Sequence, residues 1–151
     1  MIPEGDAARL HRRLRAEFPA RAPDLAREAG FATGDYILAH RIPHVAQAAL
    51  KLLPAPLAAR ALAMAIARHA WTFAGSGTVR VVDPWTFEID HNPLVRGEHG
   101  PAPLCHWHAA VFERLYARLV HRDVRCVETR CGAQAGSHTC RFEVVRWRRA
   151  D

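Results

Sequence analysis

The sequence predicts a single α+β domain in which N-terminal helices and an antiparallel sheet pack against a long helix. Helical patterns fill the first half of the chain, and two strand-like runs, a helix and two further strand-like runs follow. Strands and helices do not alternate as in βαβ units, so a parallel sheet is not expected. Half of the 151 residues are hydrophobic, which suffices for one core without disulfides.

Proline and glycine divide the N-terminal half into helices. Pro19 ends the first helix, and Gly30 is expected to end a second that Pro23 and Asp24 begin. Pro43 suits a further helix start, because proline is tolerated in a first helical turn. The predicted helical segments cover residues 6–18, 23–30, 34–40, 45–53 and 57–73.

Beyond Gly75-Ser76-Gly77 the pattern changes from helix to sheet. Alternating valines predict one strand, and Pro84 turns the chain into the next. A loop over residues 91–103, rich in Gly, Pro and His, separates these strands from a helix over residues 104–121. The predicted strands cover residues 79–82, 86–89, 124–130 and 139–147.

The net charge of +6 favours acidic partners, and much of it lies in arginines near the two ends of the chain. No zinc-finger or helix-turn-helix pattern accompanies the charge, so nucleic acid is not the expected partner. The apolar run over residues 55–67 is too short to cross a bilayer. No segment is typical of a secretory signal, and we expect a cytoplasmic protein with reduced cysteines.

The last third of the chain contains candidate metal ligands. Cys105 opens a helix, whereas Cys131 and Cys140 flank an eight-residue turn that brings them together. Glu128 lies three residues before Cys131 and would face the other way unless a bulge intervenes. Cys126 shares the parity of Glu128 and is an alternative fourth ligand. The competing hypothesis is that these cysteines are buried small hydrophobes.

Two histidines lie on apolar helical faces. His69 shares a face with Phe73 and has small alanines beside it, so a broad flat molecule could approach that helix. His108 shares a face with Cys105 that must point inward. A neutral imidazole is an axial ligand for magnesium or iron tetrapyrroles, although either histidine could equally be a core residue. The other candidate histidines are His40, His44, His91 and His106.

Several catalytic motifs are missing from the sequence. Gly75-Ser76-Gly77 follows a helix rather than a strand and lacks a third glycine, so it is not a dinucleotide-binding turn. We find no P-loop, no Gly-x-Ser-x-Gly elbow and no iron–sulfur cysteine run. A redox enzyme with this sequence would therefore need an external electron source.

Three long motifs resemble a known family, the small ligand-binding domains named after the bacteriochlorophyll-biosynthesis J protein, historically a 4-vinyl reductase. These motifs are residues 68–77, 92–98 and 105–113, and the endings Glu128–Cys131 and Cys140–Phe142 are also similar. The resemblance is absent from the first part of the chain. We therefore expect an N-terminal helical extension over residues 1–30 and a 4-vinyl-reductase-type domain over residues 31–151.

The resemblance implies an α+β ligand-binding domain, often dimeric, related to vesicle-tethering subunits and to the sensors of phenol-responsive regulators. In those sensors three cysteines and a glutamate hold a structural zinc. The pattern maps onto Cys105, Glu128, Cys131 and Cys140, although the turn before Cys140 is a residue longer than usual.

The resemblance also implies a place in magnesium-tetrapyrrole synthesis. We expect a non-catalytic carrier that binds magnesium protoporphyrin and passes it between pathway enzymes, with magnesium chelatase and the following methyltransferase as partners. Its pocket is expected between the long helix and the sheet, with His69 or His108 near the magnesium. The residues expected to meet propionates are Arg41, Arg68 and Arg96. The alternatives are a 4-vinyl reductase with an external donor, and a small-molecule sensor or scaffold.

Overall fold

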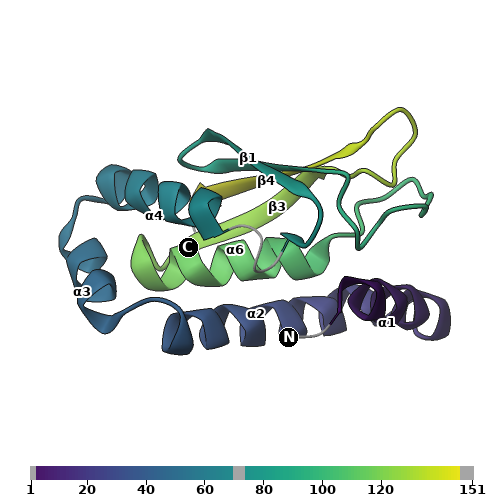
Figure 1. Ribbon diagram of the computed structural model, residues 1–151, viewed down its shortest axis with the longest axis horizontal. Coiled ribbons are helices and arrows are strands. Elements are labelled where there is room, and N and C mark those ends of the chain that lie inside the picture. The colour runs from purple at the N-terminus through teal and green to yellow at the C-terminus, as the bar shows by residue number, and fades with distance from the viewer. Residues whose placement is uncertain (1–2, 70–73, 147–151) are drawn as a thin grey trace, which may run out of the picture.

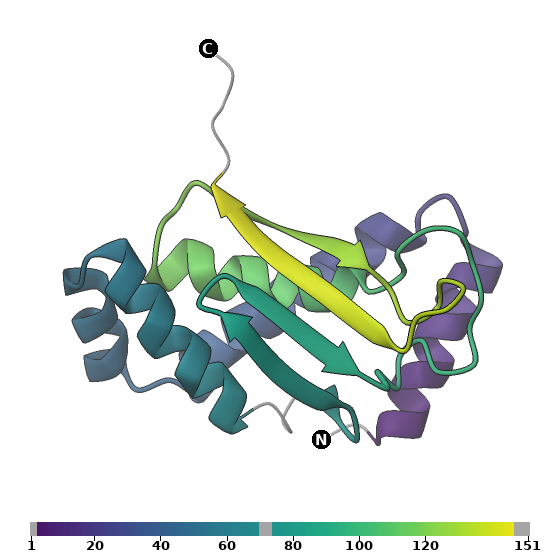
Figure 2. The same ribbon diagram turned by 90° about the horizontal axis from the view of Figure 1, so that it is seen from above.

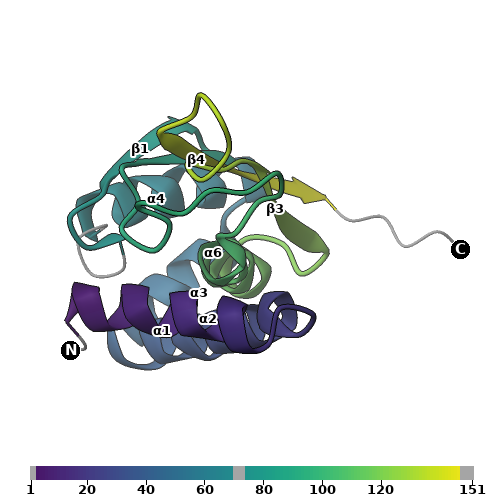
Figure 3. The same cartoon turned by 90° about the vertical axis from the view of Figure 1, so that its right-hand side faces the viewer.

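An antiparallel sheet, helix α6 and helix α2 form three successive layers (Figure 1 and Figure 3). The computed structural model describes residues 3–69 and 74–146. Its helices are α1 (Glu4–Glu17), α2 (Ala22–His40), α3 (His44–Leu52), α4 (Ala55–His69) and α6 (His106–Leu119). Its strands are β1 (Thr78–Asp83), β2 (Thr86–Asp90), β3 (Val124–Arg130) and β4 (Thr139–Arg146).

The sheet has the order β1-β2-β4-β3, and each pair of neighbouring strands is antiparallel (Figure 2). This arrangement confirms the predicted α+β class. Phe87 of β2 and Phe142 of β4 turn toward α6, where both rings contact Phe112. The rings of Phe87 and Phe112 stack with centroids 4.7 Å apart, so the core lies between the sheet and α6.

Helix α6 presents the inward face that its spacing predicts. His108, Phe112, Leu115 and Leu119 are all buried. The helix begins at His106 rather than Leu104, with Cys105 at its N-cap. Cys105 therefore lies at the boundary between the preceding loop and the helix.

Helix α2 corrects the prediction that Gly30 ends one helix and that residues 34–40 form a separate turn. The helix is continuous from Ala22 to His40 and also crosses the domain boundary expected at residue 30. A Cβ atom added to Gly30 would lie 2.4 Å from the carbonyl oxygen of Trp107, and one added to Gly34 would lie 2.7 Å from Cβ of Arg114. The glycines thus let α2 approach α6 closely, and that packing outweighs their low helix propensity.

The remaining boundaries agree with the sequence to within a few residues. Helix α3 begins one residue before the predicted start, and α4 begins at Ala55 rather than Leu57. The predicted ends of the long helix at Phe73 and of the last strand at Trp147 lie outside the described residues. No helix within residues 3–69 and 74–146 has the length and apolar character needed to cross a membrane.

The face of the sheet that points away from α6 contains a buried carboxylate, Glu88, which is 4% exposed. Arg141 donates to its Oε1 at 2.9 Å and Arg130 at 3.1 Å, while Arg80 donates to Oε2. Burial disfavours the ionised carboxyl, yet the hydrogen bonds and charges of these arginines outweigh it. The pKa of Glu88 is therefore lowered.

We expect Gly30→Ala to destabilise the fold by roughly 1–3 kcal/mol, because the new methyl group would overlap backbone atoms of α6. Gly5→Ala in α1 is the matched control, since nothing lies within 4 Å of a Cβ there. Urea denaturation monitored by circular dichroism measures both variants. Equal stability of Gly30→Ala and the parent chain would contradict the close packing of α2 on α6.

Glu88→Gln should lower the free energy of unfolding at pH 7 by roughly 1 kcal/mol, since the arginines are partly exposed and screened. A lowered carboxyl pKa stabilises the fold above the ordinary pKa of glutamate, and this contribution is lost as the pH falls through the lowered value. The difference between variant and parent should therefore shrink in acid. Glu17→Gln, at an exposed pair with Arg13, should have almost no effect at either pH.

Candidate metal centre

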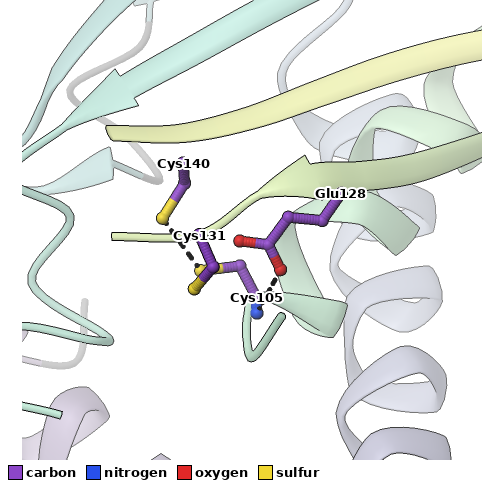
Figure 4. Close-up of side chains that lie close together, drawn as sticks. All are labelled: Cys105, Glu128, Cys131 and Cys140. Atoms are coloured by element: carbon purple, nitrogen blue, oxygen red, sulfur yellow. Dashed lines mark hydrogen bonds between the residues drawn. The ribbon is translucent and has the colours of Figure 1, made fainter. Parts of the chain in front are cut away.

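Four buried side chains from three parts of the chain converge at the N-terminal end of α6 (Figure 4). They are Cys105 before α6, Glu128 in β3, Cys131 just after β3 and Cys140 in β4. One ligand atom from each lies within 4.8 Å of the others. The structure thus brings together a three-cysteine, one-glutamate cluster that could hold a metal ion.

A β-bulge explains how Glu128 and Cys131 reach the same side of β3. Val124, Cys126 and Glu128 alternate inward as a regular strand requires. The register with β4 then shifts between Glu128 and Arg130, which adds a residue and turns Cys131 inward. The bulge that the sequence argument required is present.

The cluster is surrounded by hydrogen-bond donors. The backbone amide of Cys105 donates to Glu128 Oε2 at 2.7 Å, and that of Gly132 donates to Cys140 Sγ at 3.3 Å. The buried amide of Asn92 donates to Cys105 Sγ at 3.3 Å and lies 3.7 Å from Cys140 Sγ. Donors aimed at sulfur and carboxylate stabilise the ionised forms that bind metals.

The ionisation of these groups is coupled, because four acidic groups share one apolar site. Burial raises the pKa of Cys105, and hydrogen bonding to the other thiols adds to this. The thiols of Cys105 and Cys140 hydrogen-bond to Cys131 and lower its pKa. Burial and the nearby Cys131 raise the pKa of Glu128 to about 8. Without a cation, therefore, the four groups do not all ionise together at neutral pH.

A divalent cation fits this donor set. Glu128 Oε1 is buried and has no hydrogen-bond partner within the described part of the chain. Cys105 Sγ and Cys140 Sγ lie 3.3 Å apart, and two thiolates on one tetrahedral zinc lie about 3.8 Å apart. A small adjustment would place the sulfurs around a metal ion. Three sulfurs and one carboxylate complete a tetrahedron and leave no position for a substrate.

Cys126 is not part of the cluster, although its parity made it an alternative fourth ligand. It is buried at 2% exposure on the same face of β3 as Glu128. Its backbone amide donates to Glu113, which also accepts from Arg27 of α2. The cluster is completed by Glu128, so the structure favours the glutamate over Cys126.

The two predicted axial histidines differ in exposure. His108 is completely buried, its ring 4.8 Å from that of Trp107 and 3.4 Å from the Asn92 amide nitrogen. His69 is exposed at the C-terminal end of α4. The structure therefore places His108 beside the cluster and His69 at the surface.

The other predicted ligand-binding residues do not form one group. Arg68 is exposed on α4, and Arg96 donates to Ser76 Oγ and to the carbonyl of His91, both at 3.0 Å. Arg41 follows α2, whose end lies opposite the β2–α6 loop containing Arg96 along the molecule (Figure 1). Phe73 lies outside the described residues.

Two polar residues that support the cluster were not predicted. Asn92 bridges two of the sulfurs, and Gln134 accepts a hydrogen bond from the Cys131 amide at 2.8 Å while donating to the carbonyl of Pro101. The signal for Asn92 was the Asn-Pro dipeptide, which is typical of a turn that folds back on itself. Gln134 lies in the turn between two candidate ligands, but nothing in its spacing marks it.

Comparisons with known proteins place the chain in a family. A family model for the 4-vinyl reductase (V-4-R) domain matches residues 85–146, which include the whole cluster. Over 147 residues the chain is 58% identical to the bacteriochlorophyll synthase 23 kDa chain of Cereibacter sphaeroides, covering 96% of this chain and 71% of that protein.

The chain belongs to the 4-vinyl-reductase-domain family of bacteriochlorophyll synthase 23 kDa chains. The corresponding chain of Rhodobacter capsulatus is 49% identical over 138 residues, covering 90% of this chain and 64% of that protein. The family predicted from the sequence motifs is thereby confirmed. The relatives are longer, since this chain spans 71% and 64% of their lengths.

A solved structure shares the fold of this chain. Subunit 3 of the trafficking protein particle complex from Naegleria fowleri, covalently bound to palmitic acid, superposes with a TM-score of 0.58. The match covers 97% of this chain and 98% of that subunit at 16% identity. At this identity the likeness concerns the fold alone.

We expect purified protein to contain about one metal ion per chain, and Cys131→Ser to lose it because a ligand is removed. Cys126→Ser is the matched control: it also replaces a buried cysteine of β3, but one outside the cluster. Elemental analysis of folded samples measures the metal. The centre is refuted if the folded parent chain contains no metal, or if both variants lose it equally.

Proposed function

We propose that this chain is a non-catalytic tetrapyrrole-binding protein of bacteriochlorophyll biosynthesis, stabilised by a structural zinc ion. The names of its relatives support the pathway, since both are bacteriochlorophyll synthase chains. The carrier role rests on the exposed face of α4. The stabilising role rests on the closed cluster at the start of α6.

Zinc is the metal that best fits the cluster. Three cysteine sulfurs are soft donors, and zinc accepts them together with one carboxylate in tetrahedral geometry. When bound, the ion would supply the positive charge that lets these groups ionise in an apolar site. Because all four ligands are buried, the ion would join α6 to β3 and β4 rather than act on a substrate.

The outer face of α4 is suited to a flat aromatic ring. Ala61, Ala65 and His69 are spaced four residues apart, so they lie on one stripe of the helix, and all are exposed. The small alanines would let a macrocycle lie on the helix with the imidazole of His69 near its centre. Met64, which is 51% exposed, and Arg68 flank this stripe.

The opposite face of α4 is less suitable for the ligand, although we expected the pocket between this helix and the sheet. Leu62 and Ile66 are buried there at 2% and 5% exposure and belong to the main core. A macrocycle on that side would displace these side chains. We therefore place the ligand on the outer face, with Arg68 and Arg96 as the arginines proposed to meet propionates.

A carrier explains the combination of features better than a reductase. The sequence has no dinucleotide-binding turn and no iron–sulfur cysteine run. Magnesium protoporphyrin is apolar and poorly soluble, so its transfer between enzymes benefits from a binding protein. Magnesium chelatase and the methyltransferase that follows it are the partners we propose.

Titration with magnesium protoporphyrin, followed by absorbance, tests this function. We expect saturable binding near one site per chain and a Soret shift that metal-free protoporphyrin does not give. His69→Ala should remove the shift and weaken binding roughly tenfold, or about 1.4 kcal/mol. His44→Ala, another exposed histidine at a helix end, is the matched control.

Two outcomes would change the proposal. If His69→Ala binds like the parent chain and His108→Ala does not, the ring lies near the buried histidine instead. Absence of saturable binding by folded, metal-loaded protein discards the carrier. Turnover of a divinyl substrate with NADPH or reduced ferredoxin would replace it with a vinyl reductase.

A further inference from the structure

A cavity of about 240 Å³ lies on the side of the molecule opposite the proposed tetrapyrrole face. It is enclosed by α1, α2 and the segment that leads into α6, and Figure 3 shows α1 packed beside α2. Most of its wall is apolar and includes Leu14, Pro23, Ala26 and Leu104. The cavity is smaller than typical pockets for drug-sized ligands, so it suits a short chain or a single ring rather than a macrocycle.

Arg15 provides the fixed positive charge of the cavity wall. Its side chain is 17% exposed, and its Nη2 donates to the carbonyl of Leu94 at 3.1 Å and lies 3.5 Å from Glu98 Oε2. Its Nε is buried and has no hydrogen-bond partner among residues 3–69 and 74–146. A buried guanidinium donor without an acceptor is costly, and an anionic oxygen would satisfy it.

His11 and His106 are the other polar residues of the wall. Burial and the neighbouring Arg15 lower the pKa of His11 to about 4, so this imidazole is neutral at pH 7. A neutral ring can pack against an apolar ligand and donate one hydrogen bond. The cavity thus combines one cation with largely apolar surroundings.

We propose that this cavity binds the carboxylate of a small apolar acid, with Arg15 as the anion-binding residue. The carboxylate accepts from Nε of Arg15, and the hydrocarbon part lies against Leu14, Ala26 and Leu104. Glu98 remains on the Nη2 side of the guanidinium and fixes its orientation. Two sources have this chemistry: a free short-chain acid, and a propionate arm of a tetrapyrrole whose ring stays outside.

The cavity shares a wall with the candidate metal centre. Leu104 and His106 line it, and Cys105 between them belongs to the cluster. A metal ion that fixes Cys105 would also fix this part of the wall. The binding experiment therefore uses the metal-loaded protein.

Calorimetric titration with hexanoate and with hexanamide tests the proposal, because the two probes are similar in size but differ in charge. The parent chain should bind hexanoate saturably and at least about tenfold more tightly than hexanamide. Arg15→Met should remove this preference while hexanamide still binds, which also shows that the cavity remains folded. Arg13→Met is the matched control, since Arg13 is an exposed arginine of the same helix.

A cavity-filling variant provides a second, independent test. Ala26→Leu should abolish hexanoate binding although Arg15 is unchanged, because the larger side chain occupies the cavity. The proposal is overturned if the parent chain does not bind hexanoate or binds both probes equally. Equal losses in Arg13→Met and Arg15→Met, or full binding by Ala26→Leu, would also overturn it.

Competition distinguishes the two sources of the carboxylate. If hexanoate displaces magnesium protoporphyrin and Arg15→Met weakens porphyrin binding, the cavity takes a propionate arm. If both ligands bind together, it takes a free acid. The hexanoate titration needs no porphyrin, so failure of the carrier function and failure of this cavity site are separable.

Discussion

The convergence of three thiols and a carboxylate at the start of α6 is the constraint on which the centre of the fold depends. These groups come from the loop before α6, from the end of β3 and from the start of β4. They fix where the central helix meets the sheet. Their pKa values are driven apart because several negative charges cannot share an apolar site. A cation turns this conflict into a cross-link between helix and sheet.

The candidate centre was largely predictable from spacing, for definable reasons. A short antiparallel hairpin had to bring Cys131 and Cys140 together, and the inward face of α6 had to include Cys105. Glu128 was the uncertain member, because strand parity opposed it and only a bulge could correct this. Bulges depend on the register between two strands, which one strand's sequence does not encode. The family resemblance, rather than parity, favoured the glutamate.

Helix α2 illustrates the opposite situation. Gly30 and Gly34 are poor helix formers, and local propensity predicted a break at the first of them. The structure keeps one helix because both glycines face α6 at distances that no side chain would allow. This reason is tertiary, so it becomes visible only when the partner helix is in place. Likewise, periodicity placed both His69 and His108 on apolar faces, yet only packing reveals that one is buried and the other exposed.

The shared fold of this chain and the trafficking-complex subunit limits what architecture alone can say about function. At 16% identity the arrangement of helices and sheet persists, whereas the residues that would contact a ligand are free to differ. Function must therefore be argued from particular side chains, and here these lie on two separate surfaces. The exposed stripe ending at His69 could accept a broad ring, while the enclosed space beside Arg15 is too small for one. Because the second space borders the cluster through Leu104 and His106, the metal centre influences a binding surface without contacting its ligand.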